Sequence, residues 1–317
     1  MEYRKKKRRK KRHILGGFLL FLTAAYVLVL LAAFPGSSKI LKSGEGILDK
    51  GQDKADMSSL YSASAVLVQG ETGETLGEKK GNKRIYPASL TKMMTVLVVL
   101  ENQESLDKEV RIPEEIFPSL YQEEASMAGF LPGEHVTVRD LLYGAMLPSG
   151  GECCVALAWD TAGSEEAFAD KMNDKAKELK MHHTHFVNST GLQDKDHYTT
   201  PEDLARLLAY AWQNENFRII FTAKSYTVPP TDGHPEGFTF YNLMFQEMEE
   251  SGISSPYILG GKTGYTSDAG LCLASVGQVN GETYFLVTAK ANGSHETQPY
   301  HILDAVSVYQ ELGDSGT

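Results

Sequence analysis

The sequence has few of the residues on which disulfide-stabilised folds depend. It contains three cysteines, Cys153, Cys154 and Cys272, and two tryptophans among 317 residues. This number excludes a disulfide framework as the main source of stability. The adjacent Cys153 and Cys154 could bridge to each other only with strain. We therefore expect the three thiols to be small buried side chains.

Several functional motifs are also missing. There is no HExxH sequence, no glycine-rich phosphate loop and no internal repeat, so the usual signatures of zinc peptidases and nucleotide-binding enzymes are absent. Three histidines lie close together, but no fourth ligand follows at a standard spacing. We predict a loop leading into a strand rather than a metal site, and no metal or organic cofactor; the histidines are His182, His183 and His185.

A second group of polar residues resembles an acid-base cluster. Asp194, Asp196 and His197 follow Gly191 and precede a Thr-Thr-Pro sequence that ends at Pro201. Glycine before the group and proline after it are typical of a connection into a helix. We predict a solvated loop here.

Charge and hydropathy separate the N-terminus from the rest of the chain. Residues 4–12 read RKKKRRKKR, and an uncharged apolar run of 21 residues follows at 14–34. As a helix this run crosses a hydrocarbon core of about 30 Å and is longer than the apolar part of a cleavable signal peptide. We predict a basic cytoplasmic segment (1–13) and one transmembrane signal anchor (14–34), with the remainder outside the membrane. Cleavage at 32–37 is the alternative, and it also leaves the remainder outside.

The net charge of −10 is the sum of a basic N-terminal part and an acidic remainder. Residues 1–34 hold nine of the 31 basic residues and one of the 41 acidic residues, which leaves 22 basic and 40 acidic residues, or −18, for the rest. Such an acidic part has no electrostatic reason to bind polyanions. The apolar run directly behind the basic block favours a membrane partner over a nucleic-acid partner.

Strand patterns lie at both ends of the remaining chain. After a polar, flexible linker at 35–58, a β-type run at 63–69 and a return strand ending at residue 80 predict a hairpin. Two further β-type runs flank Asn280-Gly281, which is a strong hairpin signal.

Helical signals fill the middle, with Thr137, Ser164 and Thr200 at positions that cap the start of a helix. A last helical run covers 297–312. We predict one α/β domain at 59–317, in which an antiparallel sheet built from both chain ends encloses a helical insert.

The first of three chemical motifs is Ser89-Leu90-Thr91-Lys92. A Ser and a Lys three residues apart lie on one face of a helix, where a neutral amine can take the hydroxyl proton. The apolar run that follows would bury this lysine, and burial lowers the pKa of an amine. On its own the motif also fits a helix cap followed by a solvated lysine.

Two further motifs follow 60 and 173 residues after Ser89. Gly261-Lys262-Thr263-Gly264 lies at the head of a predicted strand, where glycines allow close approach and Lys and Thr can bind a carboxylate. A solvent-exposed turn is the alternative. Pro148-Ser149-Gly150-Gly151-Glu152 lies at a break between two helices, where Ser149 could pass a proton or cap the next helix.

The trio of Ser-x-x-Lys, a middle serine motif and Lys-Thr-Gly resembles the penicillin-binding proteins and β-lactamases. The spacing, with the stretches YPASLTKMMT, AGSEEAF, HTHFVNSTGL, HYTTPEDLA and GGKTGYTSDAG, is similar to the low-molecular-mass serine-type D-alanyl-D-alanine carboxypeptidases. The resemblance covers about residues 60–295. It implies the β-lactamase/D,D-peptidase-like fold.

The resemblance also implies roles for single residues. Ser89 would be the acylated nucleophile, Lys92 its general base and Ser149 a proton relay. A substrate-binding group would hold the terminal carboxylate and, through the backbone amides of Ser89 and Tyr265, the oxyanion; its members are Lys262, Thr263, Gly264 and Tyr265.

One residue departs from the family pattern. The third position of the middle motif is usually Asn, which donates to a peptide carbonyl of the substrate, and this chain has Gly151. Loss of one such hydrogen bond costs about 0.5–1.5 kcal/mol. We expect reduced activity and a higher turnover in a Gly151→Asn variant.

The sequence therefore predicts a membrane-anchored enzyme that removes the terminal D-Ala from peptidoglycan stem peptides ending in D-Ala-D-Ala. β-Lactams should acylate Ser89 as substrate mimics. The alternatives on the same fold are a β-lactamase, a D,D-endopeptidase, and a catalytically silent protein that binds the cell wall.

Overall fold

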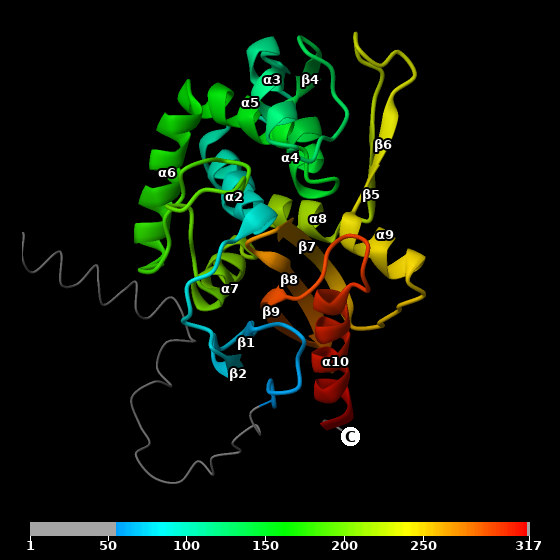
Figure 1. The fold of residues 1–317 in the computed structure, drawn as a ribbon. Coiled ribbons are helices and arrows are strands. Elements are labelled where there is room, and N and C mark those ends of the chain that lie inside the picture. Colours follow the sequence, from blue (N-terminus) through cyan, green and yellow to red (C-terminus); the bar gives the residue numbers. More distant parts are fainter. Residues whose placement is uncertain (1–54, 316–317) are drawn as a thin grey trace, which may run out of the picture. The chain divides into compact units, whose positions relative to one another are not determined.

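A five-stranded antiparallel sheet with the strand order β2-β1-β9-β8-β7 forms the centre of the computed structural model, which describes residues 55–315 (Figure 1). Its strands are β1 (Ser64–Gln69), β2 (Thr75–Lys79), β7 (Ile258–Thr266), β8 (Gly270–Val279) and β9 (Glu282–Ala291). Strand β1, from the start of the domain, pairs with β9, from its end. This pairing confirms the prediction of one sheet built from both chain ends.

Each face of the sheet has its own apolar core. Alternation along β1 sends Val66 to one core and Leu67 to the other. The Leu67 face packs against the last helix, α10 (Tyr300–Ser315). The Val66 face packs against the helical insert, which makes up most of the upper part of Figure 1. These two cores bury nearly continuous apolar strands, as expected for a sheet covered on both sides.

The helical insert occupies the sequence between β2 and β7. Its longer helices are α2 (Lys92–Asn102), α4 (Val138–Met146), α5 (Gly151–Ala162), α6 (Glu165–Glu178) and α7 (Pro201–Ala211). Its shorter elements are η2 (Ala88–Thr91), β3 (Glu109–Arg111), η3 (Glu114–Ile116), α3 (Phe117–Gln122), β4 (His135–Thr137), α8 (Glu215–Thr222), β5 (Ser225–Val228), β6 (Phe238–Tyr241) and α9 (Leu243–Glu250).

The predicted helix starts are confirmed by their hydrogen bonds. The side chain of Thr137 accepts from the Asp140 amide at 3.1 Å, and the side chains of Ser164 and Thr200 accept from amides three residues on. Each cap satisfies a backbone donor that has no partner inside the helix. The caps fix where α4, α6 and α7 begin.

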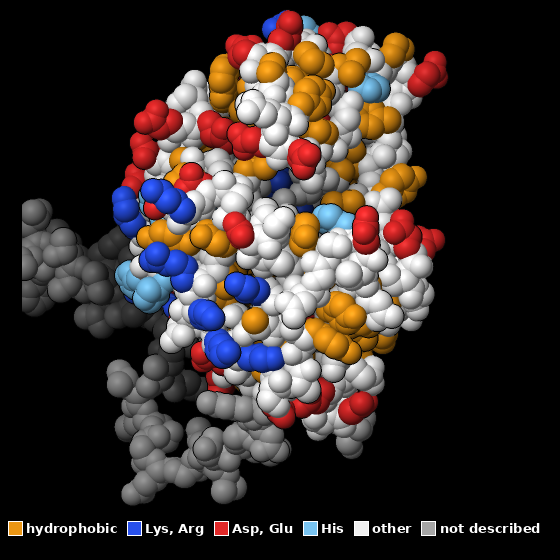
Figure 2. Space-filling model, viewed as in Figure 1, with side chains coloured by type: hydrophobic (Ala, Val, Ile, Leu, Met, Phe, Trp, Pro, Cys, Tyr) orange, Lys and Arg blue, Asp and Glu red, His pale blue; other side chains and the backbone are white. Residues whose placement is uncertain are grey.

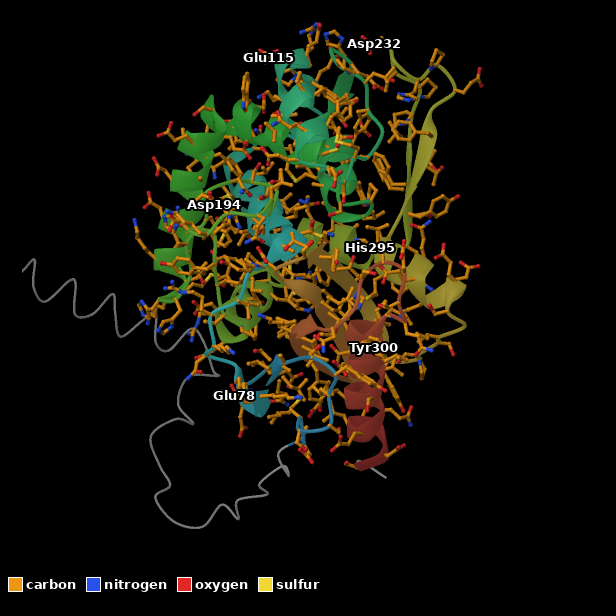
Figure 3. The ribbon with its side chains drawn as sticks, in the orientation of Figure 1. Glu78, Glu115, Asp194, Asp232, His295 and Tyr300 are labelled. Atoms are coloured by element: carbon orange, nitrogen blue, oxygen red, sulfur yellow. The ribbon has the colours of Figure 1, made fainter. Side chains whose placement is uncertain are left out.

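The sequence analysis did not predict one hairpin. Strands β5 and β6 pair only with each other and form a two-stranded arm (Figure 1). The charged loop between them contacts Glu134 and His135 at the start of β4. The imidazole of His234 lies 2.9 Å from the carboxylate of Glu134, and that of His135 lies 2.7 Å from Asp232. Figure 3 labels Asp232 at the upper end of the arm. These contacts hold the arm against the helical insert.

The described part of the chain starts inside the predicted linker at 35–58. The amide of Ala55 donates to the Leu76 carbonyl at 2.8 Å, and Met57 is 2% exposed. Folded contacts therefore begin before Ser59. All of the described residues belong to one compact unit, 52–317.

The predicted anchor at 14–34 lies outside the described residues. Between residues 55 and 315, no helix combines the length and the apolar character needed to cross a membrane.

Candidate active site

The candidate nucleophile, Ser89, lies at the junction of a short 3₁₀ helix and an α-helix. Ser89 belongs to η2, and Lys92 is the first residue of α2, so the two side chains leave consecutive turns on the same side. The Lys92 Nζ lies 2.9 Å from the Ser89 Oγ. A hydroxyl and an amine at this distance can exchange a proton directly. The structure therefore brings together the first predicted pair.

Lys92 is held in a dry environment. Its side chain is 3% exposed, and its amine also donates to the Thr190 carbonyl at 2.7 Å. Burial lowers the pKa of Lys92, and acidic groups at Cys154 and Glu152 offset part of this effect. A lowered pKa makes the neutral amine more accessible, which is the form that a general base requires.

Ser149 and Lys262 form a second, fully buried serine-lysine pair. The Lys262 Nζ donates to the Ser149 Oγ at 3.0 Å and to the Thr263 carbonyl at 2.9 Å. Ser149 and Lys262 are 2% and 1% exposed. Burial, followed by the charge of Lys92, lowers the pKa of Lys262 well below its ordinary value.

The structure changes two expectations about this second pair. Ser149 is not a cap of α5, because its hydroxyl contacts Lys262 and the residue at the cap position is Gly150. Ser149 also has a φ of +68°, a conformation that costs a non-glycine residue about 1–2 kcal/mol. The Lys-Thr-Gly motif lies in the middle of β7 and not at its head.

Strand β7 lies directly against the nucleophile turn. A Cβ atom added at Gly264 would lie 3.1 Å from the Ser89 amide nitrogen, so a larger residue here would push the nucleophile turn away by a few tenths of an ångström. The next residue, Tyr265, lines the same cleft as Ser89. Within the described part of the chain, the hydroxyl of Thr263, which is 8% exposed, forms no hydrogen bond.

The Ser89–Lys92 pair lines a cleft of about 540 Å³ between the helical insert and the sheet. Figure 2 shows it as a hollow near the middle of this face, with blue Lys or Arg atoms at its bottom. Figure 3 labels His295 at the rim. The lining residues are Ser89, Lys92, Glu123, Glu124, Ala125, Ser126, Gly151, Thr190, Gly191, Leu192, Gln193, Tyr265, Thr266, Ser267, Asp268 and His295.

His197 contradicts the prediction of a solvated loop. Its side chain is 2% exposed, its Nε2 lies 2.8 Å from the Thr91 hydroxyl, and its Nδ1 accepts from the Val187 amide at 3.2 Å. The amide donor requires an unprotonated Nδ1, so the ring proton is on Nε2 and points at Thr91. Burial is the main reason why the pKa of His197 falls to about 4. His197 thus holds the turn that carries Ser89, whereas Asp194 and Asp196 are exposed as predicted.

Two of the three clustered histidines, His183 and His185, form hydrogen bonds through their backbone. His185 forms an isolated β-bridge with Tyr198, and the amide of His183 donates to the Asp203 carboxylate at 2.9 Å. Among residues 55–315, no group of three or more His, Cys, Asp or Glu side chains could hold a metal ion. The three cysteines are free and buried, which confirms their predicted role.

Gly151 lines the cleft and packs closely against a neighbouring segment. A Cβ atom added there would lie 3.2 Å from the Leu120 side chain and 3.3 Å from both the Ala125 Cβ and the Ser126 carbonyl oxygen. An Asn at this position would displace these neighbours by a few tenths of an ångström. The expected gain from Gly151→Asn stays a prediction, and it requires these neighbours to move by that amount.

Known proteins resemble the chain over most of its length. The family model described as D-alanyl-D-alanine carboxypeptidase matches residues 51–293. A D-alanyl-D-alanine carboxypeptidase of Bacillus subtilis is 37% identical over 218 residues, which are 67% of this chain and 53% of that protein. One from Streptomyces sp. is 35% identical over 225 residues, 67% of this chain and 75% of that protein. The chain thus spans about half of the Bacillus protein.

Solved structures agree with these sequence matches. The crystal structure of a Streptomyces DD-transpeptidase has a TM-score of 0.73 and 28% identity, and the match covers 82% of this chain and 100% of that one. A D-alanyl-D-alanine carboxypeptidase of Mycobacterium tuberculosis has a TM-score of 0.70 at 24% identity, over 84% of this chain and 94% of that one, which supports the fold.

Proposed function

The chain belongs to the family of D-alanyl-D-alanine carboxypeptidases, and from this premise we propose that it removes the terminal D-Ala of peptidoglycan stem peptides through an acyl-enzyme. One observation carries the proposal for this chain: the 2.9 Å contact between Ser89 and a Lys92 amine that is 3% exposed. This geometry supplies a nucleophile with an adjacent base whose pKa burial has lowered.

In the acylation step, the Ser89 Oγ attacks the carbonyl carbon of the D-Ala-D-Ala peptide bond while Lys92 takes the hydroxyl proton. The carbonyl oxygen becomes an oxyanion, which the backbone amides of Ser89 and Tyr265 stabilise. One such donor is worth a factor of about 10² to 10³ in rate. The approach of β7 to the turn at Gly264 supports this pair of amides.

Collapse of this intermediate breaks the peptide bond. The departing amine of D-Ala requires a proton. Ser149 passes this proton on from Lys92 and Lys262, and the 3.0 Å contact between Ser149 and Lys262 supports that path. The Thr263 hydroxyl and the Lys262 amine bind the substrate carboxylate. Water then attacks the Ser89 ester, with Lys92 again as base, and releases the shortened peptide.

Substrate and location follow from the same proposal. The partners are stem peptides that end in D-Ala-D-Ala, and β-lactams bind as their mimics. The apolar run at 14–34 behind nine basic residues supports a single-pass anchor with the N-terminus in the cytoplasm and residues 35–317 outside. Protease added to intact cells should degrade the folded part and leave the N-terminal segment protected; full protection of the folded part contradicts this topology.

Acylation by a β-lactam tests the chemistry. Incubation of the full-length chain with benzylpenicillin should add one penicilloyl group, found by intact mass and mapped to the peptide that contains Ser89. The Ser89→Ala variant should remain unmodified. An adduct on another residue, or none on the wild type, contradicts the proposal. Rapid turnover of penicillin without a lasting adduct would instead favour a β-lactamase.

A further inference from the structure

One wall of the cleft packs closely on the middle motif. A Cβ atom added at Gly150 would lie 2.6 Å from the Ala128 Cβ, and one added at Gly151 would lie 3.3 Å from the Ser126 carbonyl oxygen. The segment 125–128 therefore packs closely against the position where a side chain at residue 151 would begin, and Gly151 itself also lines the cleft.

The first turn of α5 holds this segment in place. The Gly151 amide donates to the Ser126 carbonyl at 2.7 Å. The buried Glu152 carboxylate accepts from the amides of Ala128 and Gly129 at 2.7 and 2.8 Å. These three hydrogen bonds hold Ser126, Ala128 and Gly129 against the helix, so the backbone at Ser126 is preorganised before any ligand binds.

The Ser126 side chain is free to meet a ligand. Ser126 lines the cleft together with Ser89, Lys92 and Gly151. It is exposed, and within residues 55–315 its hydroxyl forms no hydrogen bond. A hydroxyl can donate one hydrogen bond, as the amide of an Asn does.

We propose that Ser126 is a substrate-binding residue, whose hydroxyl donates to the substrate carbonyl that precedes the D-Ala-D-Ala unit. The resemblance to the family implies that the Asn of its middle motif, which Gly151 replaces here, makes this contact. The inference rests on the proposed function. A neutral hydrogen bond of this kind changes a rate by about 3- to 10-fold.

Two β-lactams isolate this contact. Benzylpenicillin carries an acyl carbonyl on its side-chain amide, and 6-aminopenicillanic acid lacks that group. The measurement is the second-order rate constant for acylation of Ser89 in the full-length chain, followed by intact mass. The ratio of the two rate constants reports the contact and is internal to each variant, so a change in the folded fraction cancels.

Ser126→Ala should lower the rate constant for benzylpenicillin about 3- to 10-fold and leave that for 6-aminopenicillanic acid within about twofold of wild type. Ser126→Thr, which keeps the hydroxyl, should keep most of the ratio. Ser254→Ala, at an exposed serine outside the cleft lining, should leave it unchanged.

The outcomes separate the two claims. An unchanged ratio in Ser126→Ala, with Ser89 still acylated, overturns the role of Ser126 and leaves the proposed function standing. A wild-type chain that forms no adduct at Ser89 overturns the proposed function, and the inference that rests on it falls too.

Discussion

Replacing His197 by Gln should weaken the dependence of stability on pH. The imidazole is buried beneath the turn that carries Ser89, where its Nε2 contacts Thr91 at 2.8 Å. Burial disfavours the charged ring, an effect that the nearby charges of His185 and Lys92 reinforce and that of Asp194 opposes. Gln keeps a donor for the threonine hydroxyl and cannot titrate.

The magnitude follows from the two pKa values. His197 titrates near 6.5 in the unfolded chain and at about 4 in the folded one. Between these values the unfolded state binds a proton that the folded state does not, so the free energy of unfolding falls as the pH drops from 6.5 to 4. A difference of about 2.5 pH units, at about 1.4 kcal/mol each, amounts to roughly 3 kcal/mol.

Urea unfolding of residues 52–317 at a series of pH values measures this effect. Between pH 7 and pH 4, the Gln variant should lose about 3 kcal/mol less than the wild type. His183→Gln, at an exposed histidine, is the control and should keep the wild-type dependence. Identical pH profiles for His197→Gln and wild type would refute the reasoning.

Four further substitutions test other parts of the structure. Lys92→Met should slow acylation at least 10²-fold without lowering the free energy of unfolding, because an apolar chain replaces a buried amine; a marked loss of stability would contradict this. Ser149→Ala and Lys262→Met remove the two ends of one 3.0 Å hydrogen bond, so their effects on kcat/KM should combine to less than their product, and full multiplicativity would show that they act separately. Asp304→Ala leaves two amides at residues 61 and 62 unpaired and should cost about 2–4 kcal/mol in urea unfolding with little change in acylation by folded protein.

Much of the fold could be predicted from local signals. The Asn280-Gly281 turn joins β8 and β9 as expected, because both residues adopt the positive φ angles that such a turn requires. Thr137, Ser164 and Thr200 cap their helices, since an N-cap depends only on residues nearby in the sequence. The hairpin of β5 and β6 was missed because its aromatic side chains pack against residues distant in the sequence, such as Phe130 and Tyr143.

The site was predicted less completely. Short motifs identified Ser89, Lys92, Ser149 and Lys262, and the structure brings them together in two hydrogen-bonded pairs. His197 was placed in a solvated loop because Gly191 and Pro201 indicated a connection into a helix, although the ring is buried and its partner Thr91 is distant in the sequence.

The packing around Gly151 also depends on a distant segment. Residues 125–128 pack closely against this glycine, and no spacing rule places that segment there. Tertiary contacts of this kind decide which departures from a motif a structure can compensate.

Release of D-alanine tests the central claim most directly. A diacyl-Lys-D-Ala-D-Ala peptide would be incubated with residues 52–317, and with the Ser89→Ala variant as control. The proposal predicts release of one D-alanine per peptide by the wild type and none by the variant. Wild-type protein that binds the peptide and releases no D-alanine would contradict the proposal and favour a silent wall-binding protein, whereas equal release by both proteins would exclude Ser89 as the nucleophile.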